Sequence, residues 1–112
     1  KKVKITMLKT TLDKELAMEY GADNLTAVQC KKKGQVFYAD YANRWICDEA
    51  WKAIYQYVFA LAHGAGVGTF YYGDWIKTPG VAICSCNDGL RPVIFKLEET
   101  DEESAIDYIP VK

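Results

Sequence analysis

The chain has 112 residues, half of them hydrophobic, which is enough for one compact domain with one core and too few for two. Three Trp, eight Tyr and four Phe supply enough large apolar side chains that folding requires neither a disulfide nor a metal. The formal net charge is -1 and both signs are interspersed, which argues against the uncompensated basic surface of a nucleic-acid partner.

The sequence also predicts a compartment. No stretch approaches the roughly 20 apolar residues that span a bilayer, and the first residues alternate like a strand instead of forming the apolar centre of a signal peptide. We therefore expect a cytoplasmic protein that does not contact a membrane. In such a compartment its cysteines stay as thiols or bind a metal more often than they form disulfides.

The first three elements follow from hydrophobic spacing and end signals. In residues 2–8, KVKITML, apolar and polar residues alternate with the period of a half-buried strand. Residues 12–21, LDKELAMEYG, are typical of a short helix with Asp13 as its N-cap and Gly21 at its end. A second strand is expected within residues 34–41, GQVFYADY.

The longest element is a helix expected over residues 47–64, CDEAWKAIYQYVFALAHG. Asp48 is expected to cap its first amides and Gly64 to end it. One face is apolar at helical spacing and is expected to be buried: Trp51, Ile54, Tyr55, Val58, Leu61 and Ala62. His63, at the end of this helix, is either a ligand or proton shuttle, or a residue that caps carbonyls and favours the helix dipole.

A hairpin is expected around residues 82–93, AICSCNDGLRPV. A two- or four-residue loop centred on the Asp-Gly pair sets Cys86 opposite Arg91 and Cys84 opposite Val93. Strand alternation then places one set of side chains on a common face: Ala82, Cys84, Cys86, Arg91, Val93, Phe95 and Leu97. In this register Cys84 has apolar neighbours, whereas Cys86 lies beside a cation.

Two cysteines are candidates for chemistry. Cys47 precedes the long helix and lies near its positive end, and Cys86 faces Arg91; both surroundings favour the thiolate, which is the nucleophilic form. If the helix packs on the hairpin, Cys47 and Cys86 share one site. The alternative is that these thiols are small apolar groups in a core, because free cysteine is among the most buried residue types.

Zinc or an iron–sulfur cluster is a further alternative for the thiols. Convergence of all four, Cys30, Cys47, Cys84 and Cys86, would form a tetrathiolate site. The sequence has one Cys-x-Cys pair and lacks the paired Cys-x-x-Cys knuckles that mark zinc sites. The pattern therefore favours no metal over either of these cofactors.

A flat or apolar ligand would need a lined pocket. The residues that the sequence offers for it are Trp45, Tyr72, Trp75, Asp88 and Arg91. The same aromatic residues are also suited to a core or to a homodimer interface, and turn-forming aspartates are commoner than ligand-binding ones.

Several runs resemble a family of small single-domain proteins of anaerobic bacteria. They are Cys47-Asp48-Glu49-Ala50-Trp51, Ala60-Leu61 with the glycines that follow, Asp74-Trp75, and the most specific run, Cys86-Asn87-Asp88-Gly89-Leu90-Arg91-Pro92-Val93-Ile94-Phe95. The family often has a Cys-Pro pair before its second strand, whereas here Lys31 follows Cys30. The resemblance therefore favours Cys47 and Cys86 over Cys30, and it implies no particular reaction.

These patterns predict an α+β fold, in which a small curved antiparallel sheet packs on one long helix, with one short helix besides. We expect a single domain over residues 1–112 with a polar, acidic, loosely held segment from about residue 98. Its predicted function is to bind an unknown small molecule or protein partner near Cys47, Cys86 and Arg91 and the adjoining aromatic residues. The alternatives are a thiol-dependent enzyme that uses Cys47 or Cys86, a cysteine-ligated metal protein, and a purely structural or dimeric module.

Overall fold

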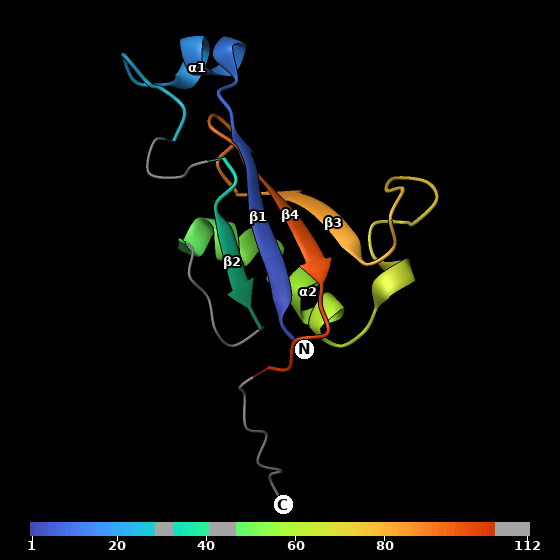
Figure 1. The fold of residues 1–112 in the computed structure, drawn as a ribbon. Helices are drawn as coiled ribbons and strands as arrows, with labels where there is room; N and C mark the ends of the chain where they lie inside the picture. The colour runs from blue at the N-terminus through green and yellow to red at the C-terminus, as the bar shows by residue number, and fades with distance from the viewer. Residues whose placement is uncertain (29–32, 41–46, 105–112) are drawn as a thin grey trace, which may run out of the picture.

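The computed structural model describes residues 1–28, 33–40 and 47–104 (Figure 1). Four strands form one open antiparallel sheet in the order β2-β1-β4-β3: β1 (Val3–Thr10), β2 (Val36–Ala39), β3 (Val81–Ser85) and β4 (Val93–Glu99). The other elements are α1 (Lys14–Tyr20), α2 (Asp48–Ala62) and a short 3-10 turn, η1 (Gly66–Gly68). Helix α2 crosses one face of the sheet, so the predicted α+β fold is confirmed.

The core lies between α2 and the sheet. Strand β1 alternates as predicted, with Val3, Ile5 and Met7 at most 1% exposed. The central strand β4 contributes Val93, Phe95 and Leu97 to the same face. Burial of these branched and aromatic side chains removes apolar surface from water, and this is the main term that stabilises the fold.

The predicted apolar face of helix α2 is largely confirmed, since four of its six residues are buried. Its buried residues are Ala50, Ile54, Val58, Leu61 and Ala62. The expectation that Tyr55 is buried is wrong, since it is 40% exposed, and Trp51 packs half-buried against the core instead of within it. The apolar residues cover a wide arc of this helix, so it could pack on the sheet in two orientations about its own axis. Contact with the sheet selects the orientation that buries Ala50.

Both ends of α2 are defined by the backbone. The N-cap is Cys47 and not the predicted Asp48, which is the first helical residue. An acidic side chain is favourable in that first turn because it faces the positive end of the helix dipole. At the other end Gly64 has a φ of +83°, and the amide of Ala65 donates to the carbonyl of Ala60 at 3.0 Å, which closes the helix as a Schellman motif.

The predicted hairpin exists, but its register is shifted by two residues. Cys84 pairs with Phe95, and the amide of Cys86 donates to the carbonyl of Val93 at 3.1 Å. The expectations that Cys86 faces Arg91 and that Cys84 faces Val93 are therefore wrong. The connecting loop is six residues long, 87–92, because Asp88 caps amides inside it and holds it open.

The remaining sequence predictions concern the ends. Asp13 caps α1 as expected, accepting from the amide of Leu16 at 3.1 Å, although α1 has no buried residue and lies beyond one end of the sheet (Figure 1). Residues 99 and 100, at the start of the segment for which the sequence predicts a loosely held end, are held in place. Strand β4 continues to Glu99, and the hydroxyl of Thr100 donates to the carbonyl of Lys2 at 2.7 Å. Within the described residues, no helix has the length and apolar character needed to cross a membrane.

Candidate functional site

A cavity of about 330 Å³ lies between the start of α2 and the loop that joins β3 to β4. It brings together Cys47, Cys86, Asp88 and Arg91, four of the residues that the sequence singled out. The cavity is lined by Val28, Cys47, Glu49, Ala50, Cys86, Asp88, Arg91, Val93 and Phe95. Its volume is at the lower end of the range for small-molecule sites.

The two thiols in this cavity have different surroundings. Cys47 is exposed at the N-cap of α2, and its side chain caps no helix amide. Cys86 is half-buried at the end of β3 and packs against the core, where its Sγ accepts from the amide of Val93 at 3.4 Å. Cys84 does not line the cavity, and burial raises the pKa of its thiol to about 12, which keeps it protonated and unreactive.

The orientation of Arg91 is set by Asp88, which lies three residues before it in the same loop. One oxygen of Asp88, Oδ1, accepts from the amides of Leu90 and Arg91 at 2.9 and 3.0 Å. The other, Oδ2, accepts from Nε of Arg91 at 3.0 Å. The ion pair with Asp88 therefore uses only Nε of Arg91. The two Nη groups make no hydrogen bond within the described residues and remain available as donors.

The pKa of Asp88 lies below its usual value of 3.8. Its partial burial acts in the opposite direction and raises the pKa. The hydrogen bonds from the backbone and side chain of Arg91 and from the amide of Leu90, with the positive charge of Arg91, together outweigh that effect.

This shift predicts how the loop responds to acid. A carboxyl group whose pKa is lower in the folded state stabilises the fold above its unfolded pKa, and this contribution is lost as the pH falls through the folded pKa. We expect Asp88→Asn to destabilise the protein at neutral pH, and the difference from wild type to shrink below about pH 4. Urea titrations of both proteins at several pH values measure this difference in the free energy of unfolding. A difference that is constant from pH 7 to pH 3 would contradict the role of the Asp88 charge.

Some residues that line the cavity were not among the site residues predicted from the sequence. Glu49 lies in the first turn of α2, and its Oε2 accepts from Nδ2 of Asn87 at 3.5 Å, which ties the helix to the loop. Val93 and Phe95 form an apolar wall and belong to the face that strand alternation predicts. Val28 carries no signal in the sequence, because it comes from an irregular segment after α1.

Two of the aromatic residues predicted to adjoin the thiols, Tyr72 and Trp75, do not line this cavity. Tyr72 and Trp75 are 48% and 70% exposed on the loop between η1 and β3, which leads into β3 at the end away from Cys86 (Figure 1). Trp45 and Cys30 lie outside the described residues. The structure thus separates the predicted thiol site from the exposed aromatic loop.

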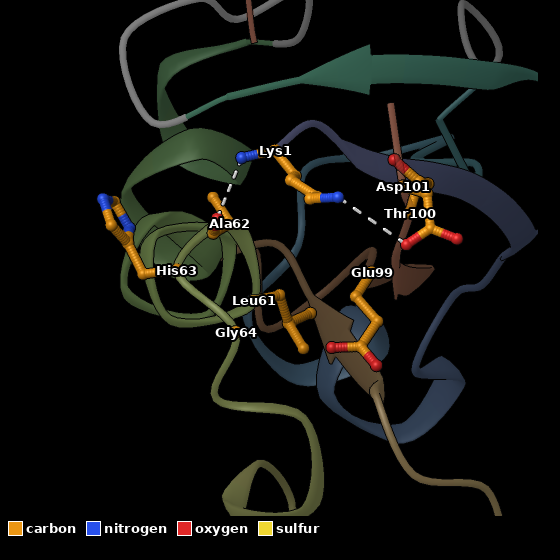
Figure 2. Close-up of a pocket in the computed structure, with 8 residues that line it drawn as sticks. All are labelled: Lys1, Leu61, Ala62, His63, Gly64, Glu99, Thr100 and Asp101. Atoms are coloured by element: carbon orange, nitrogen blue, oxygen red, sulfur yellow. Dashed lines mark hydrogen bonds and ion pairs between the residues drawn. The ribbon is translucent and has the colours of Figure 1, made fainter. Parts of the chain in front are cut away.

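A second, more polar hollow of about 510 Å³ lies at the other end of α2 (Figure 2). Nζ of Lys1 lies 3.8 Å from Asp101, and the backbone nitrogen of Lys1 donates to the carbonyl of Ala62 at 3.0 Å. The ring of His63 points away from Glu99, and its Nδ1 lies 2.8 Å from the carbonyl of Phe59. His63 therefore contacts its own helix, as the capping alternative predicts. Apart from the imidazole of His63, the described residues that line the hollow carry no aromatic ring and no thiol.

In the parts of the chain that the structure describes, no group of three or more His, Cys, Asp or Glu side chains is arranged to hold a metal ion. The tetrathiolate alternative depends on Cys30, which lies outside those parts. Comparisons of the chain with protein families, with curated proteins and with solved structures find no match.

Proposed function

We propose that the protein is a binding domain for a small, mostly apolar molecule that carries a carbonyl or carboxylate oxygen, and that this ligand occupies the cavity between α2 and the β3–β4 loop. The observation that carries the proposal is a set of hydrogen-bond donors beside the cavity that have no partner within the described residues. Burial of such donors without an acceptor costs free energy, so a site that holds several of them favours a ligand that accepts.

The first donors are backbone amides of α2. Hydrogen bonding within the helix begins when the amide of Trp51 donates to the carbonyl of Cys47 at 2.9 Å, so the amides of Glu49 and Ala50 have no partner inside the helix. The side chain of the N-cap, Cys47, does not supply one either. Both Glu49 and Ala50 line the cavity, and Ala50 is only 1% exposed. Helix N-termini favour acceptors and negative charge.

The second group of donors is on Arg91. Because Nε is paired with Asp88, the guanidinium is held in one orientation, and its Nη groups remain for a carbonyl or carboxylate. The carboxylates of the cavity are already engaged: Asp88 accepts three hydrogen bonds, and Glu49 contacts Asn87 and Lys52. Within the described residues, the cavity thus offers donors without a partner whereas its carboxylates already have partners, which favours an acceptor ligand over an ammonium ligand.

The apolar part of the ligand would contact Val28, Ala50, Val93 and Phe95. The same cavity is also where the resemblance noted in the sequence is concentrated. Among the described residues, the two runs 47–51 and 86–95 supply all of the cavity lining except Val28. This coincidence supports the proposal that these runs build a ligand site.

Benzoate is a suitable probe because it joins an apolar ring to a carboxylate, and benzylamine is its control with the same ring and the opposite charge. We expect benzoate to bind and benzylamine to bind more weakly. Arg91→Leu should weaken benzoate binding by about 10-fold to 100-fold, the range for a hydrogen bond to a charged group. Isothermal titration calorimetry measures both affinities.

Lys96→Leu is the matched control variant. It also removes one positive charge from a half-exposed side chain, but Lys96 lies on the opposite face of the sheet, near Glu98. The proposal requires Lys96→Leu to keep the wild-type affinity for benzoate. Equal losses in the two variants would show that net charge and not the cavity governs binding.

A thiol-dependent enzyme is the second candidate, favoured by one observation: Cys47 and Cys86 line the same cavity as Arg91. In that case a thiolate would attack a carbonyl carbon of the ligand. A C–S bond would form as the C=O π bond breaks, and its electron pair would move to the oxygen, which Arg91 would hold. The two candidates differ in what the thiols contribute. Cys47→Ser and Cys86→Ser should keep benzoate binding in either case, whereas only an enzyme would lose turnover of an electrophilic substrate.

A further inference from the structure

Strand β3 is one edge of the sheet, and no strand of the described residues pairs with its outer side (Figure 1). The amide of Cys86 donates to the carbonyl of Val93, and the amide of Glu99 donates to the carbonyl of Gly80 at 3.0 Å. The backbone N–H and C=O groups of the even-numbered residues in this segment therefore point toward β4. In an antiparallel pair the alternate residues, here the odd-numbered ones, direct their backbone N–H and C=O groups away from the neighbouring strand. Within the described residues these outward backbone groups, on Val81, Ile83 and Ser85, have no partner.

This edge lacks the features that normally prevent another strand from pairing. Natural edges are blunted by charged side chains, by proline or by a bulge. The sequence of β3 is VAICS, with no charge and no proline, and its pairing with β4 is regular. Beside the edge runs an open groove of about 480 Å³ between α2 and β3, bordered by Gln56, Tyr57 and Ile83 among others.

We propose that β3 pairs with β3 of a second copy of this chain, in antiparallel orientation about a two-fold axis, so that the two sheets become one. In a two-fold contact a residue on the axis meets its own counterpart, and like charges there would repel. A pairing centred on Ile83 places isoleucine against isoleucine and Val81 against Ser85, with no charge in the strand. The three outward residues of each copy then form up to about six hydrogen bonds.

The loop before β3 supports a protein partner at this edge. Its side chains Tyr71, Tyr72 and Trp75 are 61%, 48% and 70% exposed, and tyrosine and tryptophan are enriched at the centres of protein interfaces. Phe70 and Tyr71 have φ values of +58° and +50°, a region that bulky residues rarely adopt. In the antiparallel pair Val81 lies opposite Ser85 of the second copy, so the loop that precedes Val81 adjoins the β3–β4 loop of that copy.

Size-exclusion chromatography with light scattering tests the proposal. Wild type should have twice the chain mass of 12.7 kDa, and Ile83→Lys should have the mass of one chain, because it places two ammonium groups against each other on the axis. Ile94→Lys is the matched control, since Ile94 is a half-buried neighbour on the same sheet face but lies in the interior strand β4. It should remain dimeric.

Wild type that stays monomeric up to its solubility limit would overturn the proposal, as would dissociation by both lysine variants, which would place the contact on the sheet face. If circular dichroism shows that Ile83→Lys does not fold, Ser85→Pro replaces it. That change removes an outward N–H and keeps the Cys86 to Val93 hydrogen bond, so it should also give monomers. Dimeric Ser85→Pro would contradict pairing through this edge. None of these outcomes depends on ligand binding.

Discussion

Phe95→Ala is expected to lower the free energy of unfolding by about 3–5 kcal/mol. Phe95 is 1% exposed in the central strand β4, where it lies between Met7 of β1 and Cys84 of β3. Truncation to alanine removes the transfer free energy of the ring and leaves a cavity that rigid neighbouring strands cannot fill. Urea titration followed by circular dichroism measures the change.

Phe59→Ala is the matched control, because it makes the same substitution at a side chain that is 44% exposed on α2. Its ring contacts His63 at a centroid distance of 4.3 Å and little of the core, so we expect a loss below about 1 kcal/mol. Equal destabilisation of the two variants would contradict the position of Phe95 in a strand that packs between β1 and β3.

In the folded protein, Cys84 should react with iodoacetamide more than about a thousandfold more slowly than an ordinary exposed thiol. Burial raises its pKa to about 12, so at pH 8 roughly one molecule in ten thousand carries the thiolate, against about a quarter for a free cysteine. Burial also restricts access of the reagent. Mass spectrometry of peptides after timed alkylation measures each cysteine separately.

The same experiment contains its own controls. Cys47 is exposed and should be modified first, and Cys86, half-buried in the cavity wall, should follow it. In urea, Cys84 should react as fast as the other two, because unfolding removes its burial. Modification of Cys84 at the rate of Cys47 in the native protein would show that the β3–β4 register is different from the one described here.

Local signals were sufficient to predict most of the fold. Alternation in β1, the cap at Asp13 and the glycine at the end of α2 each depend on residues close in sequence, so the elements could be placed. The hairpin register could not be predicted, because Asp88 caps amides within the loop and widens it. Most of the buried face of α2 was predicted, but the exposure of Tyr55 and the burial of Ala50 were not, since they depend on which side of the helix contacts the sheet.

The candidate site was predicted in part, where local sequence signals mark its residues. Cys47 and Cys86 were singled out by a helix end and a strand end, and the packing of α2 on the sheet brings these ends to one cavity. The partner of Arg91 was missed: its Nε pairs with Asp88 three residues away and not with a residue across the hairpin. Val28 and the separation of Tyr72 and Trp75 from the cavity depend on irregular segments, whose paths have no periodic signal.

The most direct test of the proposed ligand site is to map where benzoate binds, by recording amide chemical shifts of nitrogen-15-labelled protein during a titration. Binding in the proposed cavity predicts saturable shifts at the start of α2, Cys47 to Ala50, and at the end of the hairpin, Cys86 to Val93. Shifts confined to the polar hollow of Figure 2, around His63, Gly64 and Thr100, would contradict it, and so would the absence of any saturable change.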